Sequence, residues 1–259
     1  YWRIYDSVKN SYSLDKVESP EQFYITAKAF GRFAYDLNDF DASQLVEVIP
    51  QFHDTRNRYR QLEEAIREDR VGRVKEVQEE IAFIQDRKAD CFLLYDLLDE
   101  GVLPLRVTHN DTKLNNIMFD SETKEPLCIV DLDTVMPGLV LFDFGDSIRF
   151  GANDCAEDEP DLSKVNFDFD LYETYVKGFI EGTNGILTEA ELEYLPWGAR
   201  VITLEQGIRF LTDYINGDVY YATTRPGQNL DRARTQLKLV QDMENVWDKM
   251  VEAVKNAQK

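Results

Sequence analysis

The sequence predicts an α+β protein that is mostly helical and carries one short β-hairpin. Most of the 259-residue chain shows apolar residues at helical spacing behind residues that favour helix starts. In one stretch, residues 117–130, two short apolar runs instead flank a polar, turn-like link, which is the pattern of a hairpin. Hydrophobic residues make up 43% of the chain and aromatic residues 12%, which indicates a folded globule.

The segments before the hairpin are expected to be helical. Ser19 followed by Pro20 is typical of an N-cap and a first helical position. Asp54 or Thr55 is expected to cap the next helix. Residues 62–98 continue with helical periodicity and are interrupted once, near a Val-Gly pair.

The segments after the hairpin are also expected to be helical. Residues 151–164 are acidic and polar, so they predict a loop. Residues 169–180 predict a helix, and a capping box begins another over residues 188–215. Residues 229–257 predict a single final amphipathic helix.

Composition excludes several classes of function. The formal net charge is −20, from 49 acidic and 29 basic residues, so general nucleic-acid binding is not expected. No apolar run approaches the roughly 20 residues that span a bilayer, so no membrane partner is expected. The three cysteines show no C-x-x-C spacing and are interpreted as ordinary thiols, which favours a cytoplasmic location.

A cluster of polar residues lies at one end of the predicted hairpin. Asp111 and Asn116 precede its first strand with the spacing D-x-x-x-x-N, and Asp131 and Asp133 follow its second strand. Phosphoryl transfer needs one carboxylate to accept a proton from a hydroxyl, and amide and carboxylate oxygens to hold Mg²⁺. The cluster therefore predicts a phosphotransferase site.

The motif H-x-D-x-x-x-x-N at residues 109–116 resembles that of the aminoglycoside phosphotransferase and choline kinase group. The strings HNDTKLNN and IVDLDTV are most similar to the N-acetylhexosamine 1-kinases. The resemblance implies an ATP- and Mg²⁺-dependent kinase that phosphorylates a small-molecule hydroxyl, with the anomeric hydroxyl of an N-acetylhexosamine as the expected acceptor. It further implies Asp111 as catalytic base and Asn116 and Asp131 as Mg²⁺ ligands, at the nucleotide end of the site.

The same resemblance implies a protein-kinase-like fold of which this chain is the mostly helical C-lobe. Residues 1–15 would be the last N-lobe strand and the hinge, and residues 16–259 the C-lobe with its catalytic hairpin. A Gly-rich phosphate loop and a strand lysine do not precede them in the sequence, so the N-lobe is expected to be absent. The isolated chain would then have little activity; the alternative is a complete protein that begins here.

Two residues in the string IRFLTDYINGDVYY are candidates for contact with the acceptor. By resemblance, Arg209 and Tyr220 would bind the sugar, since a guanidinium fork and an aromatic ring suit polar and apolar faces of a pyranose. The alternative is that Arg209 pairs with an acid and Tyr220 packs. Lys113 would touch a phosphate or remain solvated, and Asp133 would add a metal or substrate contact.

Other polar residues near the motif are interpreted as structural. Asp143, although it is followed by Phe and Gly, is not expected to bind the metal, because Asp131 already takes that position. By the resemblance, an acid at this point begins a helix and helps to hold the loop. Asp146 is expected to cap in the same way. His53 and His109 are expected to be hydrogen-bonding supports rather than proton donors.

Two other functions are compatible with parts of the sequence. A hydrophobic strand followed by Asp131-x-Asp133 is the pattern of haloacid dehalogenase-like phosphatases, with the first acid as nucleophile and the second as acid/base. That fold requires alternating strands and helices downstream, whereas this chain predicts helices there. A kinase-like binding module without catalysis would be expected to lack the three motif residues that are present here.

Overall fold

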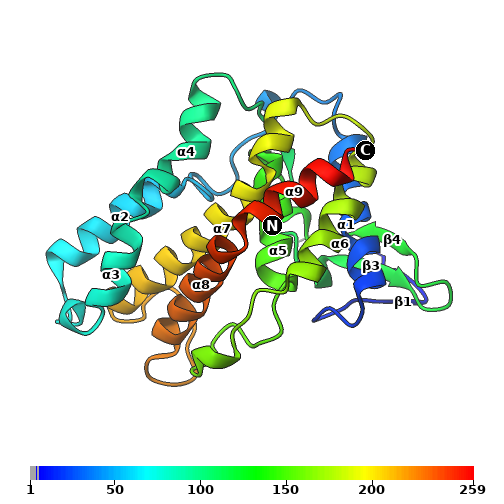
Figure 1. Ribbon diagram of the computed structural model, residues 1–259. Coiled ribbons are helices and arrows are strands. Elements are labelled where there is room, and N and C mark those ends of the chain that lie inside the picture. Colours follow the sequence, from blue (N-terminus) through cyan, green and yellow to red (C-terminus); the bar gives the residue numbers. More distant parts are fainter. Residues whose placement is uncertain (1–3, 5) are drawn as a thin grey trace.

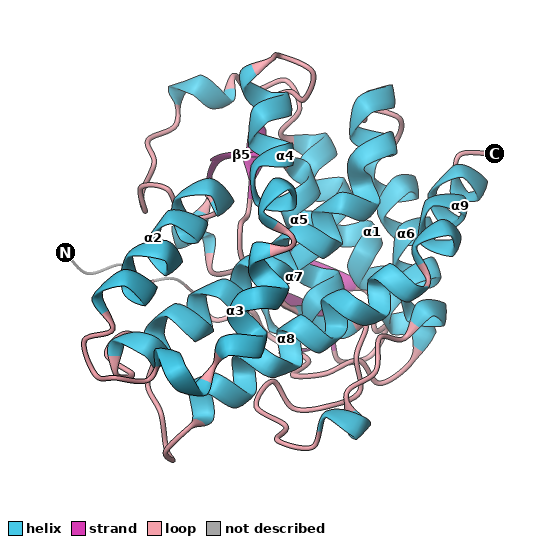
Figure 2. Ribbon diagram, turned by 60° about the vertical axis from the view of Figure 1, so that its left-hand side comes forward, coloured by secondary structure: helices cyan, strands magenta, loops and turns pink. Residues whose placement is uncertain are grey.

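The structure is a computed structural model that describes residue 4 and residues 6–259. Helices form most of it, and two small antiparallel sheets lie among them (Figures 1 and 2), which gives the mixed, helix-rich architecture that the sequence predicted. The strand expected at the N-terminus, residues 2–5, lies outside the described residues except for Ile4. No helix in the described part of the chain is long and apolar enough to cross a bilayer.

The predicted hairpin is present. Strand β3 (Ile117–Asp120) pairs with β4 (Pro126–Ile129) in antiparallel register, with Ile117 opposite Ile129. The Asp120 carboxylate accepts two backbone N–H groups of the connecting turn, at 2.8 Å each, which fixes the turn locally. Strand β1 (Ser11–Tyr12) pairs with the outer side of β3 and was not predicted, because a two-residue strand has no periodicity.

A second, two-stranded sheet frames the polar motif. Strand β2 (Arg106–Thr108) enters it and strand β5 (Met136–Gly138) follows it, and the two pair in antiparallel register. Every pairing between described strands is thus antiparallel. The segment between β2 and β5, which contains the β3–β4 hairpin, therefore starts and finishes at neighbouring positions in the two-stranded sheet.

Four helices build the larger part of the core. Helix α1 (Pro20–Asp36) packs on α6 (Phe169–Thr183), and α5 (Val140–Gly151) packs on α7 (Glu189–Asn216). The predicted caps are present, since the N-cap side chains of α1 and α7 accept the expected backbone N–H groups. Helix α5 is almost completely buried, so it is the centre of the molecule.

A second hydrophobic cluster lies at the other end of α7. There α2 (Thr55–Glu68), α3 (Gln78–Gln85) and α4 (Lys88–Asp99) surround it together with the next-to-last helix. Figure 1 shows α2 and α3 on the side opposite the hairpin. Asp54 is the N-cap of α2, as predicted. The expected single break in this region is wrong, because a second break separates α3 from α4.

The C-terminal helix is divided in two, which corrects the prediction of one continuous helix. Helix α8 (Gln228–Asn245) ends at Val246, and α9 (Trp247–Ala257) begins directly after it. Helix α8 packs mainly on α7, whereas α9 packs mainly on α6. The break lets each half bury its apolar face against a different helix, which an amphipathic pattern in the sequence does not distinguish from continuity.

Candidate active site

The loop between β2 and β3 is held by one buried carboxylate. Asp143, in the first turn of α5 and 4% exposed, accepts the backbone N–H of His109 at 2.8 Å and that of Asn110 at 2.7 Å. Thr112 donates its hydroxyl to the Asp143 backbone oxygen at 2.6 Å. Burial raises the pKa of Asp143, against the opposing effect of these N–H groups. The prediction that Asp143 braces the loop is confirmed.

The loop turns at Asn110, whose φ of 64° lies in the left-handed region that Asn tolerates. Its side-chain amide donates to the backbone oxygens of Thr108, at 3.2 Å, and Thr134, at 3.0 Å. These bonds tie the loop to the chain that follows the hairpin. No role was predicted for Asn110, although an Asn directly before the motif Asp is a signal for such a turn.

Both histidines of the chain support this loop. His109 is fully buried, and its Nε2 lies 3.0 Å from the backbone oxygen of Val130, at the end of β4. His53 places Nε2 3.0 Å from the backbone oxygen of Asn110 and Nδ1 3.3 Å from Glu205 Oε1. The supporting roles predicted for both are confirmed. His53 also connects the loop to α7, a link that the sequence did not indicate.

The three motif residues come together at the mouth of the hairpin. Asn116 donates its Nδ2 to the backbone oxygen of Asp111, at 2.7 Å, and to Asp111 Oδ2, at 3.2 Å. The Asn116 backbone oxygen accepts the N–H of Val130 at 2.9 Å, so Asp131, the next residue, leaves the hairpin at the end where Asn116 enters it. Asp131 is exposed and has a left-handed backbone with φ of 60°. Lys113 lies with Nζ 2.7 Å from Asp111 Oδ1.

These residues suit a magnesium ion that is held together with phosphate groups. Asn116 uses its amide N–H to hold Asp111, which leaves its amide oxygen as the ligand atom, and Asp131 offers an exposed carboxylate. Among the described residues, no three His, Cys, Asp or Glu side chains are grouped so as to hold a metal on their own. Mg²⁺ characteristically takes one or two protein oxygens and completes its shell with phosphate and water. The donor set therefore fits Mg²⁺ bound to a nucleotide.

A cavity of about 520 Å³ opens beside Asp111. Residues from several separate regions line it, among them His53, Lys113, Arg209 and Tyr221. Arg209, predicted to contact the acceptor, thus shares a cavity with the proposed base. The size is within the range of small-molecule sites.

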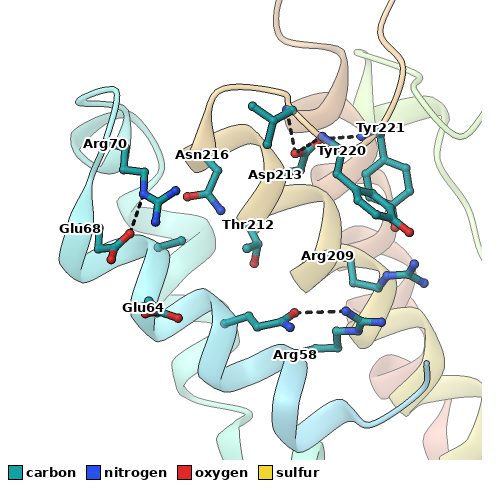
Figure 3. A pocket seen from close by; sticks show the side chains of 13 residues that line it. Arg58, Glu64, Glu68, Arg70, Arg209, Thr212, Asp213, Asn216, Tyr220 and Tyr221 are labelled. Atoms are coloured by element: carbon teal, nitrogen blue, oxygen red, sulfur yellow. Dashed lines mark hydrogen bonds and ion pairs between the residues drawn. The ribbon is translucent and has the colours of Figure 1, made fainter. Parts of the chain in front are cut away.

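Tyr220 does not line this cavity. Its side chain is 74% exposed, and it borders a neighbouring cavity together with Arg209 (Figure 3). Tyr221, which was not among the predicted acceptor-binding residues, lines both cavities. Asp213 accepts the backbone N–H groups of Tyr220, at 2.8 Å, and Tyr221, at 3.0 Å, and so decides how the two adjacent rings are presented.

Arg209 is held in place by aromatic and polar neighbours. Its guanidinium lies 5.4 Å from the ring centre of Phe52 and 5.7 Å from that of Tyr221. It donates to Gln206 Oε1 at 3.1 Å and lies 3.8 Å from the buried carboxylate of Glu205. The alternative expectation was that Arg209 pairs with an acid on the helix surface; its acidic neighbour Glu205 is instead buried, and Arg209 itself lines the cavity.

Asp146 corrects one expectation. It lies inside α5 rather than at a helix end, and its Oδ1 is 2.9 Å from Arg149 Nε, with both side chains buried at the cavity wall. Burial would raise the pKa of Asp146, but the positive charges of Arg149 and His53 outweigh it and lower that pKa. Asp146 therefore lines the cavity instead of capping a helix.

Comparison with known proteins identifies a matching family and similar solved structures. Residues 8–174 match the family described as "Phosphotransferase enzyme family". A choline/ethanolamine kinase family protein from Mesorhizobium loti is similar at 16% identity and a TM-score of 0.49, over 96% of this chain and 72% of that one.

The family match and the topology also bear on the phosphatase alternative. That fold needs a parallel sheet built from alternating strands and helices, whereas the described strands pair only antiparallel, and the chain after β5 forms helices.

Since the family match covers more than half of the chain, including every residue of the motif loop and hairpin, this protein belongs to the phosphotransferase enzyme family.

Proposed function

We propose that this protein transfers the γ-phosphoryl group of ATP to a hydroxyl group of a small molecule, most directly the anomeric hydroxyl of an N-acetylhexosamine. The observation that carries the proposal is the meeting of Asp111, Asn116 and Lys113 at the edge of a cavity that Arg209 also lines. Family membership supports phosphoryl transfer in general. The sugar rests on the motif resemblance and on the chemistry of the cavity.

In this mechanism Asp111 orients the acceptor hydroxyl and accepts its proton. Asn116 holds the Asp111 carboxylate through the 3.2 Å hydrogen bond, so the carboxylate is oriented before the substrate arrives. Lys113, 2.7 Å from Asp111, would move toward phosphate oxygens. Asn116 and Asp131 would hold Mg²⁺, which neutralises the charge on the nucleotide phosphates.

The cavity chemistry supports a sugar acceptor. Phe52, Phe210 and Tyr221 supply aromatic surface, and Arg209 and Gln206 supply hydrogen-bonding groups beside it. A pyranose ring combines apolar C–H faces with a rim of hydroxyl groups, so it matches a site of this composition. Choline, in contrast, carries a permanent positive charge and would face the guanidinium of Arg209.

The test measures ADP release from Mg-ATP with N-acetylhexosamines, hexoses, choline and aminoglycosides as acceptors. N-acetylhexosamines are expected to stimulate release, and Asp111→Asn to lower kcat by about 100-fold or more, because it removes the proton acceptor. Asp39→Asn, an exposed carboxylate outside the cavity, is the matched control and should leave kcat unchanged. Hydrolysis of phosphate monoesters without phosphorylation of any acceptor would refute the proposal.

A further inference from the structure

A second cavity, of about 370 Å³, lies between α2 and α7, next to the cavity beside Asp111, which is called the acceptor cavity below. The two cavities share Arg209 and Tyr221 as lining residues. Figure 3 shows Arg58 from α2 and Arg209 from α7 near one another at one end of this second cavity, and Arg70 with Glu68 at the other. The two cavities therefore adjoin at Arg209 and Tyr221.

The acids along the second cavity already have partners. Glu68 binds Arg70 at 2.6 Å, and Glu64 lies 3.5 Å from Arg67. Asp213 accepts the backbone N–H groups that hold the tyrosine segment. These carboxylates are therefore not the counterions of the two arginines at the other end.

Arg58 and Arg209 are only partly compensated in charge. Both approach a single buried carboxylate, that of Glu205, at 4.0 and 3.8 Å, which is beyond hydrogen-bond distance. Glu205 also lies 3.3 Å from His53 Nδ1, so one carboxylate serves three basic side chains. Burial and the proximity of Arg209 both lower the pKa of Arg58, which is the effect expected of adjacent like charges.

Arg58 has hydrogen-bonding capacity that the protein does not use. It donates to the backbone oxygen of Phe52 at 2.8 Å and to Gln61 Oε1 at 3.1 Å, both neutral acceptors. Its Nε is buried and has no hydrogen-bond partner among the residues that the structure describes. A buried donor on a charged group is costly to leave unpaired, so an anionic acceptor here would be stabilising.

We propose that Arg58 and Arg209 form a subsite for an oxyanion, a phosphate or carboxylate group that the acceptor carries at the end remote from the phosphorylated hydroxyl. Guanidinium groups bind such oxygens through paired, charge-assisted hydrogen bonds. The second cavity has room for this group, and Tyr220 and Tyr221 form part of the cavity wall. The subsite selects acidic over neutral acceptors in a protein whose overall charge is −20. The assignment of the ligand as an acceptor rests on the proposed function.

The test measures equilibrium binding by calorimetry on the full chain, without nucleotide or Mg²⁺. The probes are N-acetylglucosamine, N-acetylglucosamine 6-phosphate and inorganic phosphate. The sugar phosphate is expected to bind about tenfold or more tightly than the neutral sugar, because it adds charge-assisted hydrogen bonds. Arg58→Gln should abolish that advantage and leave the Kd of the neutral sugar unchanged within about twofold.

Arg70→Gln is the matched control, because Arg70 lines the same cavity but is paired with Glu68. It should not change the Kd of any probe. Arg58→Lys keeps the positive charge but not the paired donors of the guanidinium, so it is expected to retain part of the tighter binding of the sugar phosphate. It also tests the subsite if Arg58→Gln does not fold.

Equal binding of both sugars to the unaltered chain, or an advantage that survives Arg58→Gln, would overturn the subsite. So would the absence of binding by all three probes. If neither sugar binds but inorganic phosphate binds in a way that requires Arg58, the oxyanion subsite stands and the hexosamine acceptor fails, so the two proposals are separated.

Discussion

The contacts of Asp143 predict a large loss of stability when its carboxylate is removed. In Asp143→Ala, the backbone N–H groups of His109 and Asn110 lose their acceptor while they remain buried. Each unsatisfied buried group costs about 1–3 kcal/mol, so the two together predict a loss of about 2–6 kcal/mol. That is a large share of the roughly 5–15 kcal/mol by which domains are stable. Asp143→Asn keeps one acceptor oxygen and should cost about half as much.

The assay is urea unfolding followed by circular dichroism, with the free energy extrapolated to water for each variant. Asp120→Asn is a useful comparison, because Asp120 also accepts two backbone N–H groups, but in an exposed turn where water can replace it. Asp120→Asn should therefore lower the free energy of unfolding by much less than Asp143→Ala does. A loss below about 1 kcal/mol in Asp143→Ala would refute the conclusion that this carboxylate holds the loop.

Two further predictions concern packing and pH. In urea unfolding, Gly198→Ala should lower the free energy of unfolding by about 1–3 kcal/mol more than Gly207→Ala on the same helix. The new Cβ at residue 198 would collide with the backbone oxygen of Leu141, whereas the Cβ at residue 207 would meet the flexible end of the Leu237 side chain at 3.0 Å. Equal losses in the two variants would contradict the close crossing of α5 and α7. Burial opposes charge on His53, but the Glu205 carboxylate outweighs this and raises its pKa. The resulting stabilisation is complete below the unfolded pKa of about 6.5 and is lost as pH rises through the higher folded value. The free-energy difference between the unaltered chain and His53→Gln should thus shrink from pH 6 to pH 9, and a constant difference would exclude the linkage.

Local signals explain why much of the fold could be predicted. Capping at Ser19, Asp54 and Thr188 depends on residues within one turn, and the hairpin depends on two apolar runs and the polar link between them. The order of the motif around that hairpin also placed Asp111, Asn116 and Asp131 at one end of it. These features are short-range, so the sequence contains them directly.

The break at Val246 and the pairing of β1 with β3 were not predictable in the same way. Helix α9 leaves the line of α8 because it packs on α6, and β1 is a strand only because β3 offers it a partner. In both places the decisive contact comes from a segment distant in sequence, and periodicity within the segment is unaffected by it.

The sequence by itself predicted phosphoryl transfer at the hairpin, because Asp111, Asn116 and Asp131 have the spacing proposed for a base and two Mg²⁺ ligands, and the family match supports this class of reaction. Only the tertiary structure decided what lies opposite Asp111. It placed Arg209 at the same cavity, put Tyr221 there in place of Tyr220 through the hydrogen bonds of Asp213, and gave Arg209 and Arg58 one shared carboxylate. The physical reason is that acceptor-side residues come from helices whose relative positions are set by packing and shared buried charges, and neither is encoded in the spacing of a motif.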